Sequence, residues 1–155
     1  MNALKTLRLL PILLVLLGAS NIAQACTCLY MGTFENYSSA NPIVVRATVS
    51  GFGDKLFASS DYYASLVAEI TEIYKGEITS TSITLLGDRG MDCRSYIDPQ
   101  QFEAGNEYLF SLSSGDSTQI LGGCGESFVK IEGSLILGSG LVDGKWGTYS
   151  SSLEE

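Results

Sequence analysis

Short runs of β-branched and aromatic residues alternate with breaks rich in glycine, serine and asparagine along most of the chain. Runs of this kind predict strands, and the breaks predict turns. A short helical turn is predicted over 33–40, and one strand followed by a short helix over 128–142. The other predicted strands are 43–49, 62–74, 82–86, 106–112 and 119–121. Mixed periodicity leaves a helix open for 62–74, but several short strands between turn signals favour a small all-β barrel or sandwich.

The first 25 residues follow a different pattern. Lys5 and Arg8 precede an almost wholly apolar run over 9–17, and the segment closes on the small residues Ala23 and Ala25. A charged start, an apolar core and a small-x-small site are typical of a secretory signal peptide. A retained membrane anchor is the alternative, but a membrane span needs about 20 apolar residues. The pattern therefore favours cleavage after residue 25.

Cleavage before Cys26 defines the expected organisation: a signal peptide over 1–25, one domain over 26–149 and a flexible tail over 150–155. It removes two positive charges from a chain of net charge −8 and leaves −10. The mature protein is expected to be secreted or periplasmic, and monomeric. Lipidation of Cys26 is an alternative that would tether it to a membrane. Gln24 fits a lipoprotein signal poorly, so we expect no membrane partner unless Cys26 carries a lipid.

Four cysteines remain in the mature chain, and in an exported protein an even number predicts disulfides. A bridge between Cys26 and Cys28 would be strained, because one residue separates them. Two cross-pairings with Cys93 and Cys124 remain open. Either pairing would hold the mature N-terminus at two points. In the loop-entropy model, each bridge would stabilise the folded state by about 4–5 kcal/mol, because it closes a long loop. A metal or redox role for the first pair is the less favoured interpretation.

The composition excludes several classes of function. The chain has no histidine, so Ser-His-Asp and Cys-His catalysis are impossible and we expect no enzyme. Nine lysines and arginines against seventeen acidic residues disfavour a nucleic-acid partner. No motif indicates a cofactor of its own.

Three local motifs could be functional, but each also has an ordinary structural explanation. Asp88 and Asp92 could act as an acid–base pair, but a solvated acidic loop is favoured. The run 122–125, Gly-Gly-Cys-Gly, is not a phosphate loop because no Lys-Ser/Thr follows it. The run 36–38, Asn-Tyr-Ser, matches a glycosylation acceptor.

A mature N-terminal cysteine offers one further chemistry. The neutral α-amine and the carbonyl oxygen of one residue can chelate a metal ion in a five-membered ring. The α-amino pKa is about 7.7–8.0, so the neutral amine is accessible near neutral pH. An open catalytic zinc site keeps one position for water or substrate. A rigid terminus that presents N and O could displace that water in another protein's site.

Several features of the mature chain occur together in one known family. The chain begins with Cys-Thr-Cys at 26–28, continues with Val-Val-Arg-Ala at 44–47, and carries Ile-Tyr-Lys-Gly at 73–76. Cys93 and Cys124 lie at similar separations from the first two cysteines. The chain resembles the tissue inhibitors of metalloproteinases over nearly all of its mature length. Four further positions resemble netrin-like domains more widely: Phe102, Gly105, Tyr108 and Leu109.

The resemblance implies a fold and a disulfide pattern. The implied fold is all-β with short flanking helices, a five-stranded OB-fold-like closed barrel. The implied bridges are Cys26–Cys93 and Cys28–Cys124.

The resemblance also implies inhibition by a wedge, with a zinc metalloendopeptidase as partner. The amine and carbonyl of Cys26 would bind the catalytic zinc of the target, and Thr27 would point into its primed-side pocket. Cys28 and Leu29 would follow the cleft, and a second segment would pack beside them: Gly90, Met91 and Asp92. We call these seven residues the predicted ridge.

Some family features are absent: a third bridge in this domain, a cysteine-rich C-terminal domain and a proline-rich segment, which is replaced at 30–32. The alternative function is a non-inhibitory netrin-like binding module, exported or lipid-tethered, because a fold does not fix a function.

Overall fold

The computed structural model describes residues 30–58, 60–90, 93–142 and 145–153. This part of the chain forms one short helix and eight strands, and the all-β class is confirmed. The elements are α2 (Phe34–Ala40), β1 (Ile43–Phe52), β2 (Ser65–Lys75), β3 (Ser82–Leu86), β4 (Glu107–Leu112), β5 (Thr118–Ile120), β6 (Phe128–Glu132), β7 (Leu135–Val142) and β8 (Lys145–Ser152).

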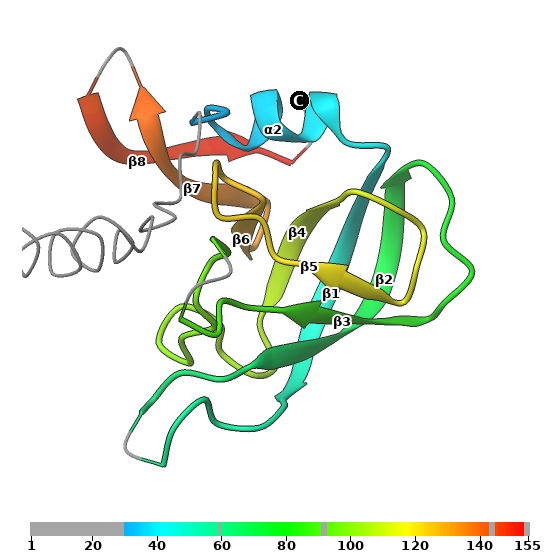
Figure 1. The fold of residues 1–155 in the computed structure, drawn as a ribbon. Helices are drawn as coiled ribbons and strands as arrows, with labels where there is room; N and C mark the ends of the chain where they lie inside the picture. The colour runs from blue at the N-terminus through cyan, green and yellow to red at the C-terminus, as the bar shows by residue number, and fades with distance from the viewer. Residues whose placement is uncertain (1–29, 59, 91–92, 143–144, 154–155) are drawn as a thin grey trace, which may run out of the picture.

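All eight strands belong to one sheet, in the order β5-β3-β2-β1-β4-β6-β7-β8. Only the β3–β5 pair is parallel. The sheet curls, so that β5 passes in front of β1 and β4 in Figure 1. The helix α2 lies above the strands, at the top of the same view. The sheet has eight strands rather than five, and within the described residues β4 pairs with β1 and β6, without a β4–β5 ladder that would close a barrel.

The main core lies inside the curled part of the sheet. Along β1, Val45, Ala47 and Val49 are buried at alternate positions, as expected for a strand with one face toward a core. Side chains from the neighbouring strands and loops complete this core: Leu66, Ala68, Ile83, Leu85, Ile97, Phe102, Tyr108, Phe110, Leu112 and Leu121. Each large apolar side chain buried here contributes about 1.5–3 kcal/mol.

A second, smaller core lies between α2 and the other face of the sheet. Phe34 of α2 packs with Val44, Leu109, Val129 and Ile131. These strand residues alternate with residues of the main core, so β1, β4 and β6 are covered on both faces. The helix is therefore fixed against β1, β4 and β6.

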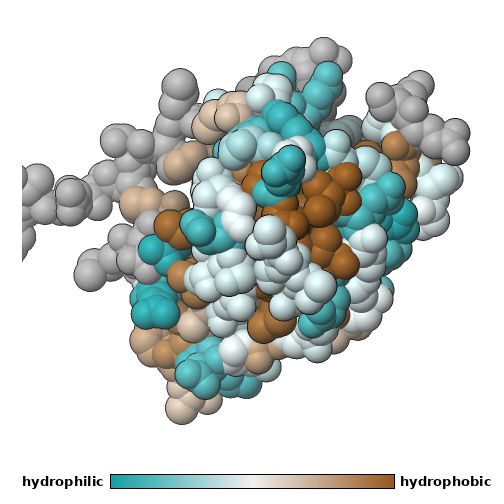
Figure 2. Space-filling view, turned by 90° about the vertical axis from the view of Figure 1, so that its right-hand side faces the viewer, coloured by the Kyte–Doolittle hydropathy of each residue, from teal (hydrophilic) through white to brown (hydrophobic). Residues whose placement is uncertain are grey.

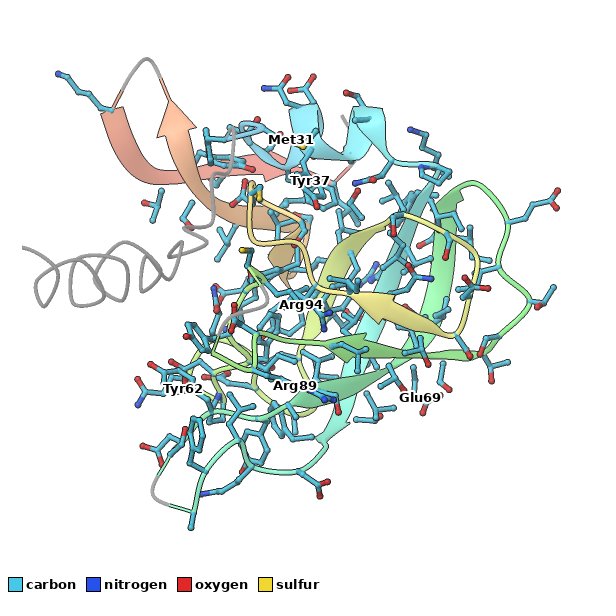
Figure 3. All side chains as sticks on the ribbon, in the orientation of Figure 1. Met31, Tyr37, Tyr62, Glu69, Arg89 and Arg94 are labelled. Atoms are coloured by element: carbon cyan, nitrogen blue, oxygen red, sulfur yellow. The ribbon has the colours of Figure 1, made fainter. Side chains whose placement is uncertain are left out.

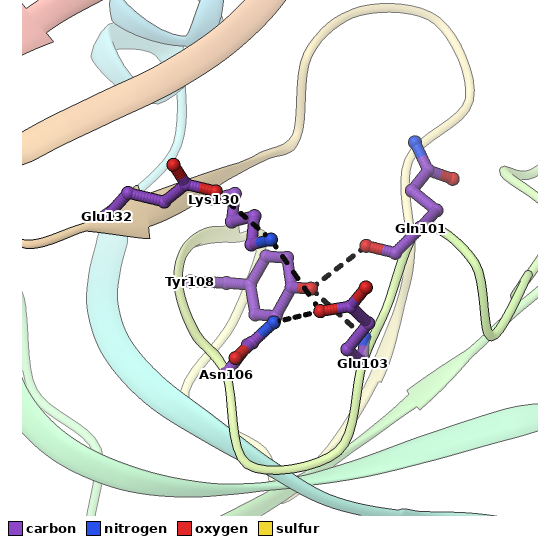
Figure 4. Close-up of polar contacts among 6 residues, drawn as sticks. All are labelled: Gln101, Glu103, Asn106, Tyr108, Lys130 and Glu132. Atoms are coloured by element: carbon purple, nitrogen blue, oxygen red, sulfur yellow. Dashed lines mark hydrogen bonds and ion pairs between the residues drawn. The ribbon is translucent and has the colours of Figure 1, made fainter.

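The loop 98–106 is held to the sheet by the Tyr108 hydroxyl (Figure 4). This hydroxyl donates to the carbonyl oxygen of Gln101 at 2.9 Å and accepts from the backbone N–H of Glu103 at 3.1 Å. Lys130 of β6 pairs with Glu132 at 3.2 Å and with Glu103 at 3.7 Å. Burial raises the pKa of the Tyr108 phenol, which favours its neutral, hydrogen-donating form.

The C-terminal third differs from the prediction. The predicted helix within 128–142 is wrong, because this segment is a hairpin of β6 and β7 that turns at Gly133, whose φ is 65°. β8 then pairs with all of β7. Residues 150–152, predicted as part of a flexible tail, continue β8.

The predicted signal peptide, 1–25, lies outside the described residues. No helix in the described part of the chain combines the length and apolar character needed to cross a membrane.

Candidate functional site

The predicted ridge is only partly within the described residues. Gly90 is described, whereas the other six lie outside: Cys26, Thr27, Cys28, Leu29, Met91 and Asp92. Tyr30, which follows the first gap, and Gly90 and Cys93, which bound the second, are described. The geometry of the site is therefore that of three flanking segments, 30–32, 88–95 and 121–127.

The segment that follows the N-terminal half of the ridge runs beside Cys124. The backbone N–H of Met31 donates to the carbonyl oxygen of Cys124 at 2.8 Å, and the N–H of Glu126 donates to that of Gly32 at 3.3 Å. A Cβ at Gly125 would lie 2.7 Å from the ring of Tyr37 and 3.1 Å from the Cβ of Met31. Only glycine permits this close approach, so the sequence at 125 fixes where the N-terminal segment meets the domain.

The second segment is a loop closed by the side chain of Asp88. Its carboxylate accepts hydrogen bonds from the backbone N–H of Gly90 and, at 3.1 Å, from that of Arg94. Asp88 is 6% exposed, although it was expected in a solvated loop. The loop contains two left-handed residues, Gly90 with φ of 110° and Cys93 with φ of 55°. For a non-glycine residue this conformation costs about 1–2 kcal/mol, so the loop stores strain at Cys93.

The second and third segments meet backbone to backbone. A Cβ at Gly123 would lie 2.8 Å from the carbonyl carbon of Arg94 and 2.9 Å from the carbonyl oxygen of Cys93. Ser95 and Ser127 both donate through Oγ to the carbonyl oxygen of Gly122, at 2.8 and 2.9 Å. The glycines of the 122–125 run therefore serve close packing.

The three segments converge on one end of the domain. Figure 3 shows Met31 beside Tyr37 of α2 and Arg94 lower in the view. The 121–127 segment joins them, because Cys124 bonds Met31 and Gly123 lies against the backbone of Arg94. Cys93 and Cys124 lie in this region, and neither is a free cysteine. The predicted pairings involve Cys26 and Cys28, which lie outside the described residues, so the pairing stays a prediction.

Glu126 fastens the third segment to the helix and to the last hairpin. Its carboxylate accepts from the backbone N–H of Phe34 at 2.9 Å, and also from the N–H of Ser139 and the hydroxyl of Tyr149. Burial, followed by the hydrogen bond to Glu126, raises the pKa of Tyr149 well above its ordinary value. Sequence reasoning missed this cluster, because its members are 34, 126, 139 and 149 and no local motif links them.

A pocket of about 750 Å³ opens beside the converging segments. Its walls include Tyr30, Glu126 and Tyr149 on the site side and Phe128, Lys130 and Leu137 on the sheet side. In the described part of the chain, no group of three or more histidine, cysteine, aspartate or glutamate residues could hold a metal ion.

No family model, curated protein or solved structure matches the chain. A function must therefore be argued from the geometry of the site.

Proposed function

We propose that this chain is an exported inhibitor of zinc metalloendopeptidases, similar to the tissue inhibitors of metalloproteinases. The single observation that carries the proposal is the convergence of the segments that flank both halves of the predicted ridge. The backbone N–H of Met31 is hydrogen-bonded to the carbonyl oxygen of Cys124. The backbone of Cys93 and Arg94 lies against Gly123, the residue before Cys124. The described residues next to both halves of the predicted ridge therefore contact consecutive residues of one loop, Gly123 and Cys124.

Chain geometry limits how far either half can extend from that loop. An extended chain spans about 3.5 Å per residue, so the four residues before Tyr30 reach about 14 Å from it. Met91 and Asp92 are bounded by Gly90 and Cys93, both of which belong to the loop closed by Asp88. A ridge built from 26–29 and 90–92 is compatible with these tethers.

The proposed bridges would make this ridge rigid. Cys26–Cys93 and Cys28–Cys124 would fasten the mature terminus to the two loops that already touch at Gly123. A rigid terminus loses little conformational entropy on binding, which is how preorganisation raises affinity. The neutral amine and the carbonyl of Cys26 would then chelate the zinc of the target, with Thr27 directed into its primed-side pocket.

We also propose that the first five strands form an OB-fold-like barrel. The supporting observation is their order, β5-β3-β2-β1-β4, together with the parallel β3–β5 pair. The two outer strands of this group, β4 and β5, are joined by residues 113–117 only. OB-folds are partly open five-stranded barrels, so a missing ladder between the outer strands is compatible with this assignment.

The test uses a panel of zinc endopeptidases and three forms of the mature protein. One form begins at Cys26 with a free amine, one carries an added alanine before Cys26, and one is acetylated at Cys26. The free form is expected to inhibit at least one enzyme, and both modified forms are expected to lose inhibition while their circular dichroism is unchanged. Equal inhibition by the extended form would overturn the chelation mechanism.

The alternative, a non-inhibitory netrin-like binding module, predicts different results. No enzyme of the panel would be inhibited by the free form. Mass spectrometry of the native mature N-terminus separates the two further, because a lipid on Cys26 would block the amine that the wedge needs.

A further inference from the structure

The outer end of β2 has an unpaired edge. β1 pairs with β2 as far as Lys75, but β3 pairs with β2 only from Ser65 to Glu69. Residues 71–75 therefore have β1 on one side and, within the described residues, no strand on the other. All five are exposed. We call residues 71–75 the open edge.

The chain after β2 turns away from this edge for a local reason. Gly76 has a φ of 76°, and a Cβ there would lie 2.4 Å from the carbonyl oxygen of Pro42. Ile78 then packs against the main core. Beyond the β2–β3 ladder there is one more backbone hydrogen bond, from the N–H of Ile70 to the carbonyl oxygen of Thr81 at 2.8 Å. The connection follows the core, so the open edge is a built feature of the fold.

The open edge combines apolar side chains with negative charge. Ile73 is 43% exposed and Tyr74 is 45% exposed. Figure 2, which views the molecule from the β2 side of Figure 1, shows hydrophobic residues gathered within a largely polar face. Glu69, Glu72 and Glu77 are exposed here, and no ion pair joins them to another described residue.

The one lysine of the open edge does not offset these charges at the edge itself. The Nζ of Lys75 donates to the carbonyl oxygens of Ser38 and Ser39, at 3.0 and 3.2 Å. These carbonyls lie in the last turn of α2, where a cation is favoured. Natural proteins commonly protect edge strands with lysine or proline, and here the lysine is directed to the helix instead.

We propose that the open edge binds an extended segment of a partner protein that carries lysine or arginine at alternate positions. The segment would add to the sheet as a strand beside β2. Backbone hydrogen bonds would supply affinity, and alternate side chains would meet Ile73 and Glu72, as in strand-addition complexes generally. Charge complementarity favours a basic segment, because the partner would face three exposed glutamates that form no ion pair with another described residue.

A second copy of this chain fits the open edge less well. Antiparallel pairing of two copies would bring both sets of glutamates together on molecules of net charge −8. Like charges that face each other across strands are destabilising.

The open edge is separate from the predicted ridge. Leu86, which leads into the 88–95 loop, pairs with Ser65 at the beginning of β2, and the open edge is at its other end. The proposal therefore does not depend on protease inhibition.

The test uses the mature protein and a fluorescent nine-residue peptide that alternates valine with lysine. Fluorescence anisotropy is expected to show binding that weakens as salt is raised. Hydrogen exchange is expected to slow at the amides of 71–75. A valine–glutamate peptide and a lysine peptide N-methylated at alternate residues are expected not to bind. Equal binding of the N-methylated peptide would overturn strand addition.

Matched variants locate the site. Glu72→Lys is expected to weaken peptide binding about tenfold, because it replaces an attraction with a repulsion. Asp54→Lys makes the same charge change at an exposed residue beyond the far end of β1, and is expected to change binding less than twofold. Equal effects of the two variants would overturn the proposal. So would sedimentation showing a dimer whose formation slows hydrogen exchange at 71–75, since a second copy would then occupy the open edge.

Discussion

The carboxylate of Asp88 accepts a hydrogen bond from the backbone N–H of Arg94, six residues later, at 3.1 Å. The same carboxylate bonds the N–H of Gly90. One buried side chain thus closes the loop that contains half of the predicted ridge. The loop also holds Cys93 in a strained left-handed conformation. Without these two hydrogen bonds the loop would lose its fixed conformation, and Cys93 could relax to an unstrained one.

Asp88→Ala is predicted to weaken inhibition as well as the fold. Removing a buried acceptor of two backbone bonds is expected to lower the free energy of unfolding by about 1–3 kcal/mol. Inhibition is expected to fall at least about tenfold, because the ridge half at 90–92 loses its support. Inhibition assays beside urea unfolding check both effects.

Asp98→Ala is the matched control. Asp98 also accepts a backbone bond two residues ahead, from Gln100 at 2.8 Å, but it lies outside the site. It is expected to leave inhibition unchanged, and a loss equal to that of Asp88→Ala would contradict a specific role for Asp88.

Gly123→Ala is predicted to separate the two loops of the site. The added methyl group would meet backbone atoms at 2.8 and 2.9 Å, which cannot rotate away as a side chain can. We expect a loss of about 1–3 kcal/mol in unfolding free energy and a parallel loss of inhibition. Gly147→Ala, whose Cβ meets nothing within 4 Å, should stay within about 0.5 kcal/mol of the parent. Similar stability of both variants would show that the loops can move apart freely.

The strands of the main core were predictable because local pattern and tertiary environment agree. The run at 43–49 is rich in β-branched residues, and from Val45 onward it alternates between buried and half-buried positions along β1. The run at 82–86 does the same along β3. Propensity and packing favour the same conformation in these segments. The short helix predicted at 33–40 is also present, and it ends at Ala40, just before the break predicted at Asn41-Pro42.

The last hairpin could be predicted only from its turn. β8 consists mostly of glycine, serine and threonine, which carry little strand signal. Two residues, Asp-Gly, separate Val142 from Lys145, and this dipeptide between paired strands is the strongest hairpin signal a sequence offers. The signal was present, but the serines that follow it also resemble a mobile tail.

The convergence of the site could not be derived from local pattern. Asp88, Gly123 and Met31 are far apart in the chain, and each belongs to a segment that reads as a loop. The approach of their three segments depends on the register of β3 with β5 and on how the segments leave the sheet. From the sequence, the glycine run at 122–125 could only be said not to be a phosphate loop. The close approach at Gly123 explains why a glycine is needed there.

Tyr108→Phe is predicted to loosen the loop 98–106 without changing the core. The ring would keep its contacts with Phe102 and Phe110, while the carbonyl of Gln101 and the N–H of Glu103 would lose their partner. We expect a loss of about 1–3 kcal/mol in unfolding free energy and faster hydrogen exchange at Glu103. Tyr62→Phe, at an exposed ring, is the control and should change neither. Unchanged exchange at Glu103 in Tyr108→Phe would contradict this role.

The stability of the protein is predicted to fall at alkaline pH partly through Tyr149. Its pKa in the folded protein is raised above the ordinary value of 10.0, first by burial and then by Glu126. The folded state therefore favours the neutral phenol. The stabilisation is fully present below pH 10 and is lost as the pH rises from there toward the folded pKa, because the unfolded chain ionises first. Urea unfolding at pH 8, 10 and 11 measures this loss.

Tyr149→Phe isolates the contribution of this phenol. The variant is expected to be less stable at pH 8 by about 1–2 kcal/mol, since Glu126 and the N–H of Phe34 lose a partner. It should also lose less stability than the parent between pH 10 and 11, because it has no phenol to ionise at this site. Tyr62→Phe removes an exposed phenol instead and should follow the parent curve. Parallel curves for the parent and Tyr149→Phe would contradict a raised pKa of this phenol in the folded protein.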